Sequence, residues 1–432
     1  MTFKISDSIT GKTNISAKHP CFDKEAKGTY GRVHIPIAPT CNIQCNYCNR
    51  DYDCVNESRP GVTSSLLKPQ QAVEYLKNLT SKYENITVAG IAGPGEAFAQ
   101  PNILMDTLEG MKNDGVDIIP CLSSNGLDIY PYIDDLERLG VKHVTLTING
   151  MSLDVLEKIY SWVRFGKRVY RGRKAAEILH ENQMKALKKL GEKNFIVKVN
   201  MVLIPGINAS DVEAVAKVAA GNNASVMNLI PLKPVKDTPF QNVGEPSHTE
   251  INELRKVIEK YLKPMTHCAR CRADAAGLLG KDLSDTSELL KYYANMQIGK
   301  AAGNKRVAVA SNEGIMVNLH LGEARFFYIF EEENGEYKFI EQRTTPSPGE
   351  GDARWVRLGE ILSDCRGVLV AGIGAKPTRT LEGKFGLRVI EMTGLIGDGL
   401  DAIFKGKEIR TLNRSDMQKC GDNCSGNGVG CA

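Results

Sequence analysis

Four cysteines lie within residues 41–54, in the segment CNIQCNYCNRDYDC. The first three, Cys41, Cys45 and Cys48, follow the spacing C-x3-C-x2-C. Three thiolates this close in sequence can bind three irons of one 4Fe–4S cubane and leave the fourth iron open to a small chelating ligand. A structural zinc site, the main alternative, needs four protein ligands and is usually built from paired C-x2-C knuckles. The spacing therefore favours an iron–sulfur cluster with one open iron.

The composition of the chain indicates the cellular compartment and the classes of partner to expect. The chain has 432 residues, 12 cysteines and a formal net charge of +4. Its polar N-terminus carries no export signal, and no apolar run reaches the roughly 20 residues of a membrane helix, so we expect a cytoplasmic protein with no membrane partner. Basic residues are scattered, which predicts no nucleic-acid partner. Because thiols stay reduced in the cytoplasm, the cysteines favour metal binding over disulfides.

Strand-like and helix-like segments alternate from residue 33 to about 262. Six βα units of this kind predict an α/β fold with a parallel sheet, curled as a barrel or part of one. In such folds the chemistry collects at the carboxyl ends of the strands, and the three-cysteine segment follows the first of them. The expected strands are 33–39, 86–93, 117–124, 143–150, 195–203 and 225–232.

The pattern changes after residue 303, where alternating strands with an Asn-Gly hairpin turn predict a second, smaller α/β domain. There we expect Cys365 to be a buried residue of a helix, within ARWVRLGEILSDC. The role of the tail cysteines Cys420, Cys424 and Cys431 stays open. The expected organisation is an N-terminal extension (1–32), the barrel (33–280), a linker (281–303), the small domain (304–410) and a Gly- and Cys-rich tail (411–432).

With these motifs the chain resembles the radical S-adenosylmethionine (SAM) enzymes. The resemblance implies that SAM chelates the open iron and is cleaved reductively to a 5′-deoxyadenosyl radical. The segment AGPGEAFA (92–99) is similar to the family's glycine-rich segment, with Gly93 and Gly95 preceding Glu96, which would accept a hydrogen bond from the SAM amino group. Taken alone, this segment is equally an ordinary βα turn. Further expected SAM contacts, with core or turn roles as the alternative, are Ser123, Asn125, Asn149 and Asn200.

A longer set of segments narrows the resemblance to the nitrogenase cofactor maturases within that family. The set comprises HPCF, VHIPIAPTCNIQCNYCNRDYDCVNESRPGV, AGPGEAFA and HCARC, in this order. Residues 304–410 resemble the NifX-like domain, an RNase H-like fold that binds iron–molybdenum cofactor precursors. The resemblance implies two further 4Fe–4S clusters, which are substrates. Their implied ligands are Cys21, His34, Cys54, Cys121, Cys268 and Cys271.

The implied reaction fuses the two substrate clusters into an eight-iron precursor that contains a SAM-derived carbide and an extra sulfur. Implied partners are an iron–sulfur donor protein and downstream nitrogenase cofactor assembly or carrier proteins. Which ligand serves which cluster stays open, as does whether His19 is a ligand. Glu57 and Arg59 are expected either to position a cluster or the cofactor, or to pair with each other on a loop. Two other functions stay open: a radical SAM enzyme acting on a peptide or small molecule, and a cluster carrier.

Overall fold

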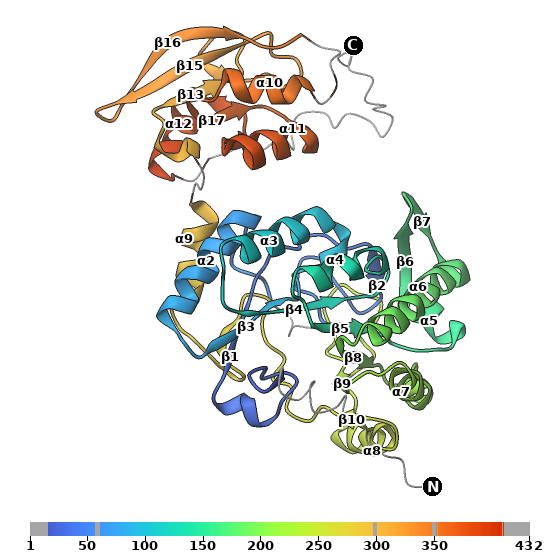
Figure 1. Cartoon of the computed structure of the whole chain (residues 1–432). Coiled ribbons are helices and arrows are strands. Elements are labelled where there is room, and N and C mark those ends of the chain that lie inside the picture. Colours follow the sequence, from blue (N-terminus) through green and yellow to red (C-terminus); the bar gives the residue numbers. More distant parts are fainter. Residues whose placement is uncertain are drawn as a thin grey trace. The chain divides into compact units, whose positions relative to one another are not determined.

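The computed structural model describes residues 16–56, 61–296, 300–347, 351, 353–407 and 409. The chain forms two compact units, divided between Ala294 and Asn295 (Figure 1). The expected linker, 281–303, lies partly in the first unit, which contains β12 (Lys281–Asp282) and all of α9 (Thr286–Asn295) except its last residue. In the part of the chain described here, no helix combines the length and apolar character that a bilayer span requires.

The first unit is built on a nine-stranded sheet with the order β10-β9-β8-β5-β4-β3-β1-β11-β12. Strands β1 to β10 of this sheet are parallel, whereas β11 and β12 are antiparallel to their neighbours. This confirms the predicted α/β class and the partial barrel-like parallel sheet. The strands are β1 (Gly31–His34), β3 (Ile86–Ile91), β4 (Ile119–Ser124), β5 (His143–Thr147), β8 (Ile196–Leu203), β9 (Val226–Pro231), β10 (Lys263–Pro264), β11 (Ala276–Leu278) and β12.

Helices connect the parallel strands. They begin where the sequence provides start signals, as at Pro69, which occupies the first turn of α2, where a backbone N–H has no partner within the helix. Each helix buries one apolar face, which in α2 includes Leu76 and Leu79. The helices are α2 (Pro69–Lys82), α3 (Pro101–Asn113), α4 (Ile133–Arg138), α5 (Leu153–Ile159), α6 (Gly172–Glu192), α7 (Val212–Gly221) and α8 (His248–Glu259).

The two faces of the sheet differ in character because successive side chains of a strand point to opposite sides. One set of alternating positions is buried and apolar, as with Val33, Ala89 and Val144. The alternate positions carry the polar side chains of Arg32, His34, Cys121, Ser123, Thr145, Lys198, Asn200 and Asn228, all of which line one cavity. The sheet thus separates an apolar core from a polar inner face.

A small three-stranded sheet, absent from the sequence prediction, lies beside the main one. It consists of β2 (Ile43–Cys45), β6 (Tyr160–Phe165) and β7 (Arg168–Tyr170) in that order. Strand β2 holds part of the three-cysteine segment and pairs antiparallel with β6. The segment is therefore fixed by a hairpin that lies more than a hundred residues further along the chain.

The second unit contains a five-stranded sheet with the order β16-β15-β13-β17-β18. The predicted hairpin turn is present, since Asn334 and Gly335 both have positive φ and join β15 to β16. Cys365 is fully buried, but its prediction as a helical residue is wrong, because α10 ends at Ile361 and Cys365 begins β17. The elements are β13 (Arg306–Val309), β14 (Met316–Val317), β15 (Phe326–Glu333), β16 (Glu336–Thr344), α10 (Ala353–Ile361), β17 (Cys365–Val370), α11 (Ala375–Arg379), β18 (Arg388–Glu391), β19 (Gly394–Leu395) and α12 (Ile396–Lys405).

Candidate active site

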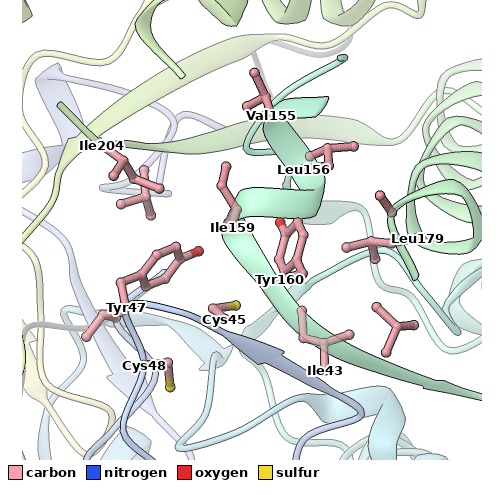
Figure 2. Close-up of a cluster of buried hydrophobic side chains, with 14 of the residues drawn as sticks. Ile43, Cys45, Tyr47, Cys48, Val155, Leu156, Ile159, Tyr160, Leu179 and Ile204 are labelled. Carbon is pink, nitrogen blue, oxygen red and sulfur yellow. The ribbon is translucent and has the colours of Figure 1, made fainter. Parts of the chain in front are cut away.

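The three-cysteine segment is held in place by backbone hydrogen bonds. Cys45 lies opposite Tyr160 in the β2–β6 ladder, and the N–H of Asn46 donates to the carbonyl oxygen of Ile159 at 2.8 Å. The N–H of Cys48 then donates to the carbonyl oxygen of Cys45 at 3.0 Å, which turns the chain back. Figure 2 shows Cys45 and Cys48 among the buried side chains that surround this turn. Backbone hydrogen bonds therefore position Cys45 and Cys48.

The thiols of this segment are close enough to affect one another. Burial raises the pKa of Cys45 well above its ordinary value, and the charges of Cys48, Cys41 and Cys54 raise it further. Burial, followed by the charge of Glu96, raises the pKa of Cys41 to about 11. Cys54, expected as a ligand of a substrate cluster, thus lies beside the three-cysteine segment. Each thiol would have to lose a proton before binding iron.

Arg50, which the sequence prediction missed, supplies positive charge to this group of thiols. Burial lowers the pKa of its guanidinium, but the charges of Cys41, Cys48 and Cys54 raise it more, so the side chain stays charged. Its Nη2 donates to the carbonyl oxygen of Pro39 at 3.0 Å. A fixed cation beside thiolates would offset the negative charge that they acquire on binding iron.

The three thiols of this segment are compatible with a cluster. Within the described ranges, no three His, Cys, Asp or Glu side chains converge as the ligands of one metal ion do. The thiolates of a cubane need not converge in this way, because each binds a different iron. The residues 41, 45 and 48 therefore suit a 4Fe–4S cluster.

The glycine-rich segment pairs with the residues just before Cys41. The N–H of Gly95 donates to the carbonyl oxygen of Ala38 at 2.6 Å, and the N–H of Glu96 donates to that of Thr40 at 2.8 Å. A Cβ atom on Gly95 would lie 2.1 Å from the Thr40 oxygen, so only glycine permits this approach. Gly93 has φ of +152°, which other residues rarely adopt. Both glycines thus serve to bring Glu96 next to the three-cysteine segment.

The Glu96 carboxylate is buried and accepts three hydrogen bonds. Its Oε1 accepts from the N–H of Phe98 at 3.1 Å and from the hydroxyl of Ser124 at 2.8 Å, and its Oε2 accepts from the N–H of Asn125 at 2.7 Å. Burial outweighs these bonds and raises the pKa to about 7. Among the residues with described side chains, no lysine or arginine forms an ion pair with it. A buried carboxylate of this kind suits a bound ammonium group.

The other predicted SAM contacts have different surroundings. Asn125 donates from Nδ2 to Oδ1 of Asn42 at 2.7 Å and so links Glu96 to the residue after Cys41. Asn149 is fully buried, and its Nδ2 donates to the hydroxyl oxygens of Tyr47 at 2.6 Å and Tyr160 at 3.1 Å. The structure therefore places Asn149 as a support for Tyr47, and its contact with SAM remains a prediction.

The predicted ligands of the substrate clusters meet in the cavity on the polar face of the sheet, with one exception. His34 comes from β1, and Cys121 comes from β4. Cys21, Cys268 and Cys271 reach the same cavity from loops. Cys268 and Cys271 reach the cavity because β11, which follows them, pairs antiparallel with β1 and so brings the preceding segment back to the sheet. Cys54 is the exception, as it is absent from the cavity wall.

Ser123 and Asn200, predicted as SAM contacts, also line this cavity. The hydroxyl of Ser123 is buried and has no hydrogen-bond partner in the structure. Nδ2 of Asn200 donates to the carbonyl oxygen of Asn56 at 3.1 Å. Asn200 therefore ties the cavity wall to the loop that carries Cys54.

Buried cations line the same cavity, and sequence reasoning missed them. Nε of Arg32 donates to the sulfur of Cys271 at 3.1 Å, and its Nη2 forms an ion pair with Asp282 at 2.7 Å. Lys198 and Arg270 are also part of the wall. Burial, with smaller contributions from the charges of Cys271 and Cys268, raises the pKa of Cys21 to about 12, so these three thiols lie near one another. The cations suit an anionic guest such as an iron–sulfur cluster.

His34 is arranged as histidine ligands of metals commonly are. Its Nδ1 lies 2.8 Å from the carbonyl oxygen of Arg272. Because a carbonyl oxygen only accepts hydrogen bonds, Nδ1 carries the proton and Nε2 keeps a lone pair. Burial, followed by the charge of Arg32, lowers the pKa to about 4, so the ring is neutral. Gly90 leaves room for this ring, since a Cβ there would lie 2.8 Å from Cδ2.

Two further groups of predicted residues lie outside the described ranges. These are Glu57 and Arg59, which follow Cys54 in the sequence, and the tail cysteines Cys420, Cys424 and Cys431.

Comparison with known proteins identifies the family of this chain. The Radical SAM superfamily matches residues 35–219, and the dinitrogenase iron–molybdenum cofactor family matches residues 303–406. The chain is 42% identical to the FeMo cofactor biosynthesis protein NifB of Chlorobaculum tepidum, over 96% of this chain and 98% of that protein. It is 36% identical to NifB of Klebsiella pneumoniae, over 85% of this chain and 86% of that protein.

Among solved structures, the chain is similar to Streptococcus suis SuiB bound to S-adenosylmethionine, with 14% identity and a TM-score of 0.39 over 60% of this chain and 56% of that one. The full-length similarity to the two NifB proteins confirms the resemblance seen in the sequence. The chain belongs to the NifB family, the radical SAM enzymes of FeMo cofactor biosynthesis.

Proposed function

We propose that this chain fuses two 4Fe–4S clusters into the eight-iron precursor of the nitrogenase cofactor, taking the carbon of a central carbide from SAM and adding one further sulfur. The observation that carries the proposal is the loop of residues 54–56. Cys54 lies among the thiols of the three-cysteine segment, while the carbonyl oxygens of Val55 and Asn56 accept hydrogen bonds from Arg270 and Asn200 in the cavity wall. A SAM molecule at that segment would therefore lie next to clusters in the cavity.

In this account the protein first binds and shields SAM. Cys41, Cys45 and Cys48 would hold the radical SAM cluster, which when bound supplies the electron for SAM cleavage. Glu96 accepts a hydrogen bond from the amino group of SAM. The apolar residues around Tyr47 and Tyr160 exclude water from the three-cysteine segment and so protect a reactive radical from side reactions.

The cavity binds the two substrate clusters and has to release their product. The proposed ligands are Cys21, Cys121, Cys268, Cys271 and His34 in the cavity wall, together with Cys54 on the adjoining loop. A neutral imidazole binds iron less tightly than a thiolate, so a mixed set of ligands holds a substrate cluster without trapping it. Arg32 and Lys198 offset the negative charge of the clusters.

The second unit has a different proposed role. Between residues 304 and 410 the sequence contains one cysteine, Cys365, and its side chain is fully buried. This segment therefore lacks the thiols for a cubane of its own. We propose that it binds the finished precursor and passes it to downstream assembly or carrier proteins. An iron–sulfur donor protein delivers the 4Fe–4S clusters to the first unit.

The experiment that tests this function is anaerobic reconstitution with iron, sulfide, dithionite and SAM labelled in its methyl carbon. We expect both S-adenosylhomocysteine and 5′-deoxyadenosine to form, and the label to enter the iron–sulfur product. A cluster carrier would consume no SAM. A radical SAM enzyme with another substrate would form 5′-deoxyadenosine without placing label in a cluster, which would contradict the proposal.

Replacing Glu96 with glutamine should weaken SAM binding about 10- to 150-fold, since a hydrogen bond to a charged group contributes about 1.5–3 kcal/mol. Binding is measured by equilibrium dialysis of the reconstituted protein. The Asp128→Asn variant is the matched control, because Asp128 is a nearby, partly buried carboxylate that accepts from Asn42. If the Glu96→Gln variant binds SAM with wild-type affinity, Glu96 does not contact SAM.

Replacing His34 with alanine should abolish nitrogen coupling to a substrate cluster in pulsed electron paramagnetic resonance of the reduced protein. The lone pair on Nε2 is the reason to expect this coupling in the wild type. Gly90→Ala should weaken the same coupling, because the added methyl group would displace the imidazole. If His34→Ala retains the wild-type coupling, another residue supplies the nitrogen.

A further inference from the structure

The two histidines that line the cavity, His19 and His34, have opposite tautomers. Nδ1 of His19 lies 3.2 Å from the backbone N–H of Cys21 and accepts its hydrogen bond. Because an N–H group only donates, Nδ1 holds a lone pair and the single proton of the neutral ring is on Nε2. His34 has the reverse arrangement, with its proton on Nδ1. In the cavity wall, one ring therefore keeps a lone pair on Nε2, and the other carries an N–H there.

Among the described residues, the Nε2–H of His19 has no hydrogen-bond partner, although the side chain is only 1% exposed. The ring is held in place by Phe22 and His143, whose centroids lie 4.7 and 4.5 Å away. His143 is itself held by Ser16, with Nε2 3.0 Å from the hydroxyl oxygen. A buried donor that is rigidly held and unpaired is unusual in a folded protein and calls for a ligand.

We propose that His19 is not an iron ligand but donates a hydrogen bond from Nε2 to a sulfur of the substrate cluster bound at Cys21. This inference rests on the proposed function, because it takes that cluster to be the guest of the cavity. Ser123 is a second unpaired donor in the same wall and suits the same kind of acceptor. A hydrogen bond to cluster sulfur stabilises the more negative, reduced state and so raises the reduction potential. His19 thereby sets how readily this substrate cluster is reduced.

Three variants separate this role from the alternatives. His19→Asn keeps an oxygen near the Nδ1 position for the N–H of Cys21 but has no group at the Nε2 position. His19→Gln extends an amide N–H to the Nε2 position. His19→Phe keeps the ring packing against Phe22 and His143 and has neither nitrogen. The full-length protein is reconstituted in each case, and its iron content, nitrogen coupling and reduction potentials are measured by chemical analysis and redox-titrated paramagnetic resonance.

We expect all three variants to bind wild-type amounts of iron and to keep the nitrogen coupling of His34. The reduction potential of one cluster should be lower than in the wild type in the Asn and Phe variants. In the Gln variant it should be closer to the wild-type value. Loss of one cluster's iron or of nitrogen coupling in the Asn and Phe variants would make His19 a ligand and overturn the proposal. Wild-type potentials in both would overturn it by leaving His19 a purely structural role.

These measurements require no turnover, so they are separate from the test of the proposed function. A potential shift in a protein that makes no carbide-containing product would support the role of His19 and contradict the proposed reaction.

Discussion

The Cys45→Ala variant should lose SAM cleavage completely while keeping most of the iron bound in the cavity. Cys45 is the most restricted of the three thiols, since it is 5% exposed and lies in the β2–β6 ladder. Removing it leaves two thiolates for a cluster that has an open iron, which is too few to retain the cluster in a form that binds SAM. The cavity ligands come from other segments, so their clusters should remain. Cleavage is followed as 5′-deoxyadenosine formed under reducing, anaerobic conditions.

Cys365→Ala is the matched control for this variant, because Cys365 is also buried but lies in the core of the second unit. It should retain both the iron and the cleavage rate of the wild type. If Cys45→Ala cleaves SAM at a rate near that of the wild type, the three-cysteine segment has been assigned wrongly.

The double variant Cys268→Ser/Cys271→Ser should lose about four irons, one cubane, and make no carbide-containing product. Both cysteines line the cavity, and the charges of both act on Cys21, so the three thiols lie near one another. The serine hydroxyl at position 271 keeps a hydrogen-bond acceptor near Nε of Arg32. The bonds of Arg32 to Asp282 and to the carbonyl oxygen of Gly277 are unchanged, so the variant should still fold. Iron content and product are measured in the same reconstituted sample.

SAM should still be cleaved by this double variant, because the three-cysteine segment is intact, but the cleavage should be unproductive. Wild-type iron content would show that the pair has only a structural role. Loss of all iron would instead point to unfolding, which a comparison of circular dichroism spectra with the wild type would reveal.

The sequence was sufficient for features that depend on local patterns. Six of the seven parallel strands were predicted because each is a short apolar run bounded by turn residues and followed by an amphipathic helix, whereas the two-residue β10 is too short to show such a pattern. Residues 41, 45 and 48 could be predicted as cluster ligands because ligand spacing within one segment is visible without a structure. Glu96 could be predicted as a SAM contact from the two glycines before it, and the structure explains one of these by the close approach of Gly95 to Thr40.

Features that depend on distant contacts were not predictable in this way. Strand β2 has three residues, too few to show a periodic pattern, and its partner Tyr160 follows it by more than a hundred residues. In the sequence, Arg32 and Lys198 cannot be told apart from ordinary surface cations. Only the folded sheet shows that both are buried on its polar face. The hydrogen bonds that the Asn149 amide donates to Tyr47 and Tyr160 likewise join distant segments, while its predicted contact with SAM stays a prediction.

The most direct measurement of the central claim is the activation of nitrogenase that lacks its cofactor. Reconstituted protein is incubated with SAM and dithionite, and the released cluster is added to the cofactor-free enzyme together with the remaining assembly components. If the chain fuses the two clusters as proposed, substrate reduction by nitrogenase should appear only when SAM is present. It should be absent with the Cys45→Ala variant. If the fully iron-loaded protein cleaves SAM but its product never activates nitrogenase, the proposed cluster fusion is contradicted.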